Sequence, residues 1–339
     1  MWSYVVWPLI GAAMLPQAAA SQSGGLEQWL RGEGGFTNSE MRSLRTGAPL
    51  VRIVDSESLA TLSLLGAVRV ATTPASVIAL FNRPSEFLAT PSTLAAGQVH
   101  IPPRIDDFRT IRLPPSDLPE LAACRPGSCK VKLALGPMAD LGEAARGPPI
   151  DREASVTARF RSMLFDYADS FVRQGLDGLP EYVDKARPLS TAAAMAPLRA
   201  LDPSFFEQSR VLTRHLRAFP HSTAEGVTDR MAWTLEDVGL RPTVRLLHLA
   251  LIQPPDAPSV DALIAIQQLY ATHYLQASIT YLSLVIDTSV AGEAARFLVL
   301  LSRFSFDGEV TGIRRSALVR SSVANQEARL RTLQQRLRP

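Results

Sequence analysis

About the last hundred residues constrain the fold more than any other part of the chain. Three strongly apolar runs typical of strands lie at about Thr243–Ile252, Leu263–Ile286 and Phe297–Phe306, and a basic amphipathic helix is predicted at Ile313–Leu337. An antiparallel sheet of such strands needs cover for its apolar face. A terminal helix laid across a curved sheet provides that cover and leaves room for a cavity. The sequence therefore predicts an α+β fold in which an antiparallel sheet is covered by a long C-terminal helix.

The predicted C-terminal helix has one apolar face and one basic face. Its apolar stripe has a single polar interruption, Gln326, and arginines occupy much of the remaining surface. The stripe comprises Val319, Val323, Leu330, Leu333 and Leu337. One interpretation is a core-covering helix whose basic face is solvated. The other is a surface that makes peripheral contact with an anionic membrane.

The composition is that of a globular protein. The chain has 339 residues, of which 46% are hydrophobic and 20% charged, so it can bury a large core and is not disordered. The formal net charge is only +3, and the basic residues are almost all arginine. No basic stripe interleaved with aromatic residues and no nucleic-acid motif is visible. We therefore expect no nucleic-acid partner.

The first twenty residues resemble a signal peptide. They carry no charged side chain, Val5–Ala13 is apolar, and small residues occupy the −3 and −1 positions before Ser21. An uncleaved anchor is the alternative, although Pro8 and Pro16 would make a poor spanning helix. We expect Met1–Ala20 to be removed on export, and the mature protein to be periplasmic or secreted.

The two cysteines, Cys124 and Cys129, flank the turn dipeptide Pro126-Gly127. In an exported protein this arrangement predicts a local disulfide. Free thiols or a redox pair are the alternatives, but a redox pair usually has two intervening residues where this chain has four. A zinc site would need further ligands, and none lie nearby in the sequence.

The rest of the chain divides into three parts. Strands are predicted at Leu50–Val54 and Thr61–Ala71, followed by a helix that begins at Pro74. Residues 84–150 are rich in proline, and residues 151–240 show helical periodicity. Within the latter, a helix is predicted at Arg152–Gln174, ended by Gly175. Short strands are predicted inside the proline-rich segment at Gln98–Ile101, Thr110–Leu113 and Val131–Leu135.

This order of elements resembles the START-like helix-grip superfamily, also called SRPBCC, which includes steroidogenic-type lipid-transfer domains and polyketide cyclases. Thr61–Ala71 followed by Thr73–Phe81 resembles the strand-to-helix entry of that family. Phe297–Gly308 followed by Gly312–Leu337 resembles its exit. The chain is also similar to secreted bacterial proteins that have no assigned activity and carry a Cys-x-x-Gly-x-Cys turn and a Tyr-Ala-x-His-Tyr segment.

The START-like resemblance implies a single domain over residues 21–339. In this interpretation the proline-rich segment 84–150 replaces the central strands, and the helical block 151–240 is an insertion that acts as a lid. The resemblance also implies an apolar or amphipathic, lipid-like ligand held between the sheet and the C-terminal helix.

The sequence contains no recognisable catalytic motif. G-x-S-x-G, H-E-x-x-H, P-loop and G-x-G-x-x-G patterns are absent, and the five histidines are scattered. No pair of histidines has the spacing of three or four residues that a helical metal site needs. We therefore expect no metal, no cofactor and no assignable catalytic residue. A cyclase- or hydrolase-like role for His273 with Tyr270 or Tyr274 is the weakest of the functional hypotheses.

Five residues are the candidates for contact with a ligand: His273, Tyr270, Tyr281, Gln267 and Gln268. They interrupt an otherwise apolar predicted sheet, where a buried imidazole or amide can orient the polar end of a ligand. Buried polar groups also bond internally in most proteins. Two main hypotheses follow, an exported ligand-binding protein and a non-catalytic envelope module with a solid core.

Overall fold

The structure is a computed structural model that describes residues 25–338, with gaps at 33, 55–57, 200–209, 222–223, 238–240, 255–256, 258 and 288–294. The predicted signal peptide therefore lies outside the described residues. The strands are β1 Leu50–Val54, β2 Thr61–Val70, β3 Thr93–Val99, β4 Val227–Glu236, β5 Thr243–Ile252, β6 Val260–Ala271, β7 Leu275–Asp287 and β8 Ala295–Phe306. The helices are α1 Leu26–Gly32, α2 Asn38–Arg45, α3 Pro74–Phe81, α4 Pro84–Leu88, α5 Leu118–Ala123, α6 Leu135–Arg146, α7 Arg152–Gln174, α8 Thr191–Leu198, α10 Arg210–Ala218 and α11 Gly312–Arg336.

The described strands form one sheet in the order β1-β2-β8-β7-β6-β5-β4-β3, in which every neighbouring pair is antiparallel. The α+β class with a long C-terminal helix is confirmed. The N-terminal hairpin β1–β2 pairs with the last strand, so both ends of the chain meet at one side of the sheet.

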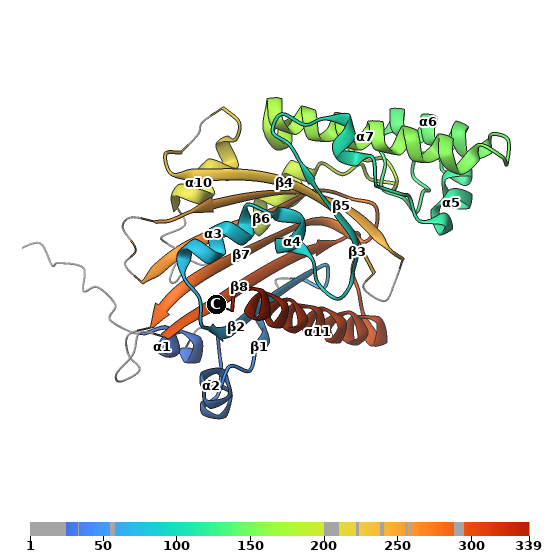
Figure 1. Ribbon diagram of the computed structural model, residues 1–339. Coiled ribbons are helices and arrows are strands. Elements are labelled where there is room, and N and C mark those ends of the chain that lie inside the picture. Colours follow the sequence, from blue (N-terminus) through green and yellow to red (C-terminus); the bar gives the residue numbers. More distant parts are fainter. Residues whose placement is uncertain are drawn as a thin grey trace, which may run out of the picture.

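Helices cover both faces of this sheet (Figure 1). On one face, Leu330 and Leu333 of α11 share a core with residues of α3, α4 and the central strands. On the other face, α1 and the helices α6, α7, α8 and α10 bury a larger core against the same strands. The sheet is therefore apolar on both sides, which only a layer of helices on each side can shield from water.

The C-terminal helix approaches the sheet closely because β2 carries a glycine beneath it. A Cβ atom added to Gly66 would lie 2.9 Å from Leu330 Cδ1 and 3.1 Å from the Leu50 carbonyl oxygen. Gln326, the polar interruption of the apolar stripe, is buried, and its Nε2 donates to the carbonyls of Leu64 (3.2 Å) and Leu300 (3.3 Å). The Gln326 side chain therefore lies over β2 and β8 and hydrogen-bonds to the protein itself.

Two helix starts follow from their capping residues. Thr37 forms a capping box with Glu40 at the start of α2, in which each residue's side chain accepts from the other's backbone N–H. At the start of α3, the Thr73 hydroxyl accepts from Ser76 N, and Pro74 occupies the first turn as predicted.

Several predicted elements differ from the structure. Val227–Glu236, within the block predicted to be helical, is strand β4. Thr110–Leu113 and Val131–Leu135 are not strands: Lys132 N donates to Thr272 O at the end of β6, and Leu135 begins α6. The apolar run Leu263–Ile286 is divided between β6 and β7 by a turn, and β7 begins at Leu275.

In the sequence of β7 the alternation of apolar and polar residues is lost near Leu282, which would suggest a bulge or the edge of the sheet, but neither is present there. β7 is an interior strand, and its pairing is regular at this point. Tyr281 is buried in one core and Leu282 in the other. A strand covered on both faces has no polar side, so its sequence cannot alternate.

Cys124 and Cys129 form the predicted disulfide. The turn between them docks onto a distant segment, with Gly127 N donating to Val183 O (2.8 Å) and Cys129 N to Asp184 O (3.0 Å).

None of the helices in the described part of the chain combines the length and apolarity that a membrane span requires.

Candidate functional site

A groove of about 850 Å3 lies between α11 and one end of the sheet. Its floor is formed by the first residues of β5, the turn between β6 and β7, and the end of β8; the first half of α11 forms the opposite side. The volume falls within the range of ligand pockets, about 300–1,000 Å3. We call this feature the α11 groove.

One side of the α11 groove is apolar. Leu275, Phe304 and Phe306 contribute to it from the sheet, while Val310 and Leu318 approach from the chain leading into α11 and from α11 itself. The rings of Phe304 and Phe306 are stacked with their centroids 6.4 Å apart. These side chains lie on the α11 side of the sheet because alternate residues of β8 point to alternate faces.

The opposite side of the α11 groove is polar. Arg245 Nη2 donates to Ser278 Oγ (2.7 Å), whose hydroxyl in turn donates to Gln268 Oε1 (3.2 Å). Arg245 Nη1 lies 3.4 Å from the nearer carboxylate oxygen of Glu236. A guanidinium group therefore sits at the surface of the groove on a support of buried polar side chains.

A second arginine, Arg329 of α11, lies beside this cluster. Its Nε and Nη2 atoms are buried without a hydrogen-bond partner among the described residues, as is Nε of Arg245. Burial lowers the pKa of Arg329 to about 10; the charge of Glu236 acts in the opposite direction, and that of Arg245 adds to the lowering. The guanidinium group remains charged at neutral pH, so two cations share one nearby carboxylate.

The turn between β6 and β7 forms the rim of the groove. Both ring nitrogens of His273 face acceptors, with Nδ1 2.9 Å from Lys130 O and Nε2 3.0 Å from Asp117 Oδ2. Tyr274 has a φ of 63°, a conformation that costs a non-glycine residue free energy and is enriched near functional sites. Its hydroxyl accepts from Arg241 N (3.0 Å), which holds the turn against the start of β5.

A network of opposite charges closes the same rim. Arg241 contacts both Asp117 (3.3 Å) and Glu120 (2.7 Å), and Lys130 also contacts Glu120 (2.8 Å). Hydrogen bonds from Lys130 and Arg241 lower the pKa of Glu120. These rim cations are therefore paired closely with carboxylates, whereas Arg245 lies 3.4 Å from its carboxylate partner Glu236.

The predicted ligand-binding residues do not converge. His273 lines the α11 groove and Gln268 supports it from behind, but both bond internally. Tyr270, Tyr281 and Gln267 belong to the opposite face of the sheet, where Tyr270 donates to Lys132 O (2.8 Å). Burial raises the pKa of Tyr281 to about 12 and that of Tyr270 well above its usual range.

Gln267 takes part in a separate buried cluster. Its Nε2 donates to His248 Nδ1 (2.8 Å), and the other ring nitrogen of His248 donates to Asp229 Oδ1 (2.7 Å). His215 Nε2 donates to the same oxygen (2.9 Å), while Arg199 donates to Gln267 Oε1. The side-chain atoms named here are all paired, which is the pattern of a structural network, although Nε of Arg199 is buried without a hydrogen-bond partner among the described residues. No trio of His, Cys, Asp or Glu in the described part of the chain has the geometry of a metal site.

The helices of the predicted insertion do not form a lid over the α11 groove. α7, α8 and α10 lie on the opposite face, and none of their residues lines the groove. Sequence reasoning missed Arg245 and Glu236, on the polar side of the groove, and Arg329 beside them. The available signal was an arginine at a position where β5 is otherwise apolar, together with Arg329 next to the apolar stripe of α11.

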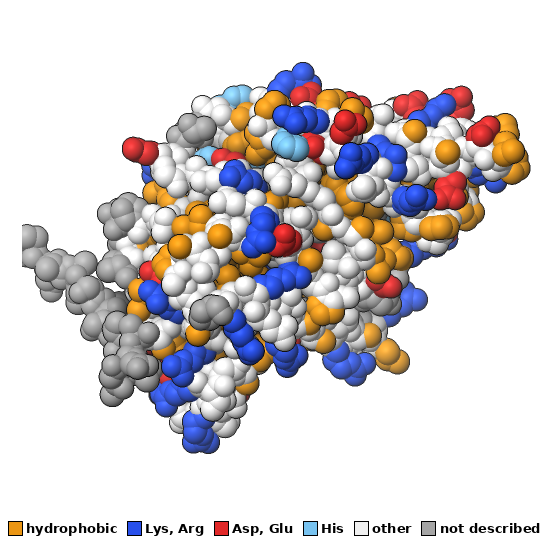
Figure 2. Space-filling model, in the orientation of Figure 1, with side chains coloured by type: hydrophobic (Ala, Val, Ile, Leu, Met, Phe, Trp, Pro, Cys, Tyr) orange, Lys and Arg blue, Asp and Glu red, His pale blue; other side chains and the backbone are white. Residues whose placement is uncertain are grey.

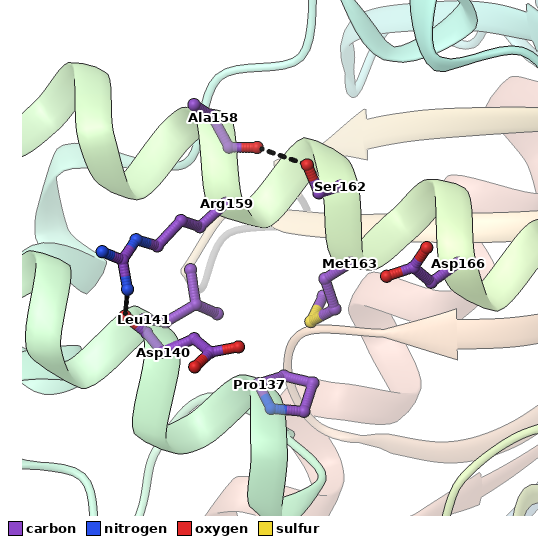
Figure 3. A pocket seen from close by; sticks show the side chains of 8 residues that line it. All are labelled: Pro137, Asp140, Leu141, Ala158, Arg159, Ser162, Met163 and Asp166. Atoms are coloured by element: carbon purple, nitrogen blue, oxygen red, sulfur yellow. Dashed lines mark hydrogen bonds between the residues drawn. The ribbon is translucent and has the colours of Figure 1, made fainter.

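A smaller pocket of about 260 Å3 lies between α6 and α7 (Figure 3). Arg159 reaches across it to donate to Asp140 O (2.9 Å), and Asp166 lies at its other end. Burial raises the pKa of Asp166, with a further contribution from Asp169. The volume is below the usual range for small-molecule sites.

On the face shown in Figure 2, Lys and Arg side chains are scattered rather than gathered into one basic patch.

Comparison of the chain with protein-family models, with curated proteins and with solved structures finds no match. The functional argument therefore rests on the geometry of the α11 groove.

Proposed function

We propose that this protein binds an amphipathic, lipid-like small molecule in the α11 groove. The observation that supports this most strongly is the groove itself, about 850 Å3 in volume, with an apolar side and a cationic side facing one another. The apolar part of the ligand would lie against Phe304, Phe306 and Leu318, and its polar end would lie toward Arg245. Such a division of surfaces matches the two ends of an amphiphile.

The expected affinity is moderate. Burial of about 400 Å2 of apolar surface contributes roughly 10 kcal/mol at 25 cal/mol per Å2. Association costs about 4 kcal/mol or more in lost translational and rotational freedom. The difference corresponds to dissociation constants of roughly micromolar order or weaker, which would allow the ligand to be released as well as carried.

A carrier role outside the cytoplasm fits the rest of the chain. The N-terminal segment has the pattern of a signal peptide, and Cys124–Cys129 is a disulfide, a bond that persists in oxidising compartments. We propose a periplasmic or secreted location, with no catalytic step. START-like lipid-transfer proteins remain the family that the order of elements resembles.

The test is to fill the groove. Leu318 lines it from α11, so Leu318→Trp should displace a fluorescent fatty acid and weaken its binding at least tenfold by occupying the same volume. Ser316→Trp adds the same ring two residues away, at an exposed position that does not line the groove, and should leave binding unchanged. Binding is measured by fluorescence titration, and native mass spectrometry of the wild-type protein should show retained amphiphiles.

Equal binding by the wild-type and Leu318→Trp proteins would refute the assignment of the ligand to this groove. No binding of any amphiphile by the wild-type protein would favour the alternative of a non-catalytic envelope module.

A further inference from the structure

Arg245, which lines the α11 groove, and Arg329 beside it carry more positive charge than their shared carboxylate neutralises. Arg245 and Arg329 face Glu236, whose carboxylate is shared further because Oε1 accepts from Thr234 Oγ1 (2.9 Å). The contacts from Arg245 Nη1 to the two oxygens of Glu236 are long, at 3.4 and 3.5 Å. Close arginine–carboxylate pairs lie at about 2.7–2.9 Å. Glu236 therefore satisfies neither arginine fully.

The unsatisfied donors are specific atoms. Nε of Arg245, together with Nε and Nη2 of Arg329, is buried and has no hydrogen-bond partner in the described part of the chain. The neighbouring Nε and Nη2 of Arg329 form one edge of a guanidinium group, the edge that receives a carboxylate or phosphate in a bidentate pair. Leaving such donors buried and unpaired is costly, so their arrangement indicates an absent anionic acceptor.

Arg329 also has the right position on its helix. Ser322 and Asn325 line the groove from α11, and Arg329 follows them at the seven- and four-residue spacings that share a helix face. Leu330, the next residue, is completely buried against the sheet and fixes the helix at this point. Arg329 therefore shares the α11 face that lines the groove and lies one turn beyond Asn325, the last lining residue of the helix.

We propose that the ligand is an anionic amphiphile whose carboxylate or phosphate headgroup binds between Arg245 and Arg329. This inference rests on the proposed ligand-binding function and adds the charge of the ligand and the location of its headgroup. The headgroup oxygens accept from the free edge of Arg329 and from Arg245 Nε, and the hydrocarbon chain runs from there toward Phe304, Phe306 and Leu318. Glu236 and Ser278 hold Arg245 in place and do not contact the hydrocarbon chain of the ligand.

The experiment compares probes that share one hydrocarbon chain: decanoate, decyl phosphate and decanol, each used as a monomer, together with inorganic phosphate. Isothermal titration calorimetry with the wild-type protein should give an affinity for one or both anionic amphiphiles at least tenfold higher than for decanol. The better of the two anions identifies the headgroup as carboxylate or phosphate. Because this comparison needs no substitution, it remains a test even if an arginine variant fails to fold.

Substitution then locates the headgroup. Arg329→Gln should lower the affinity for the preferred anion at least tenfold and leave that for decanol unchanged, while Arg329→Lys should give an intermediate loss because lysine cannot form a bidentate pair. Arg320→Gln removes an exposed arginine of the same helix and should have no effect on either affinity.

The possible failures are distinguishable. Equal affinity for all three amphiphiles would overturn the headgroup assignment while supporting the proposed function, and the absence of binding by all three would overturn both. Binding of inorganic phosphate as tightly as decyl phosphate would also overturn the inference, because the site would then belong to a free anion.

Discussion

Asp229 is an example of a residue whose charge contributes to folding rather than to the candidate site. Burial raises its pKa, but hydrogen bonds from His215 and His248 outweigh burial and leave the pKa at about 2. The neighbouring His248 has a lowered pKa, mainly because burial disfavours the charged ring. Both residues therefore keep the charge state that the cluster needs at neutral pH.

These two shifts predict loss of stability in acid. The unfolded chain protonates His248 near 6.5, whereas the folded protein keeps the ring neutral, so stability is full above that pH and falls as the pH drops below it. Asp229 adds a second loss between about pH 4 and pH 2, worth roughly 2 kcal/mol for a pKa lowered from 3.8 to about 2. Urea unfolding at a series of pH values measures both.

Asp229→Asn should destabilise the protein at pH 7 and reduce the loss of stability below pH 4 by the contribution of Asp229, while Glu40, whose pKa is also lowered to about 2, keeps its own. Asp106→Asn is the matched control, because Asp106 is an exposed carboxylate. An unfolding free energy for the wild-type protein that does not change between pH 7 and pH 5 would contradict the account of His248.

Prediction from the sequence was poorest for the site residues. Polar residues in an apolar strand were recognised, but whether a given residue faces α11 or α7 depends on register and bulges. The register shift between β5 and β6 at Leu246/Leu247 places Gln268 and Tyr270 on opposite faces, although they are two residues apart. The bonds that occupy His273 come from Asp117 and Lys130, more than 140 residues earlier, where nothing in the local sequence indicates contact.

At the scale of elements, the close contact between α11 and β2 depends on the absence of a side chain at one position. Gly66→Ala should cost about 1–3 kcal/mol, because the added methyl group would overlap Leu330 and approach a backbone oxygen that cannot move away. Gly136→Ala makes the same change within α6, where nothing lies within 4 Å, and should be neutral or slightly stabilising. Thermal and urea unfolding of the two variants provide the comparison, and equal stability would refute this role of Gly66.

The disulfide turn permits a second prediction at this scale. Replacing both cysteines by serine should cost about 2 kcal/mol, the chain-entropy value for a loop this short. A reducing agent should lower the melting temperature of the wild-type protein by a similar amount and leave that of the double variant unchanged. If the reductant affected both proteins equally, the stabilisation would have to come from elsewhere.

Elements with strong local signals were predicted accurately. α7 was predicted at Arg152–Gln174, its observed bounds, because its apolar stripe has a clear helical period and Gly175 ends it. β4 was missed because it was included in the helical block that precedes it, although Met231, Trp233 and Leu235 recur at every second position. The extended segment around Val131 has strand-like alternation but pairs with no strand, since Val131 and Leu133 are buried beneath the helices at the end of the sheet.

At the scale of the whole molecule, the predicted covering helix is only one of two layers. The last hundred residues contained strands β5 to β8 and α11, and their apolar content was attributed to one buried face and a cavity. The second layer explains most of that content, because β5 to β8 are buried on both faces. The α11 groove is what remains open, at the end of the sheet where α11 extends past the helices that share its face.

The pairing of β2 with β8 also governs when this molecule can fold. Ser63 and Arg303 are paired across these strands although they are 240 residues apart in the sequence. Closing so long a loop is slow, and no earlier strand can substitute for β8 in the middle of the sheet. A chain emerging from a ribosome or a translocation channel would hold the β1–β2 hairpin without β8 until that strand appeared. Completion of the sheet thus awaits β8, and a truncation that removes β8 should separate the β1–β2 hairpin from the rest of the sheet rather than remove an edge strand.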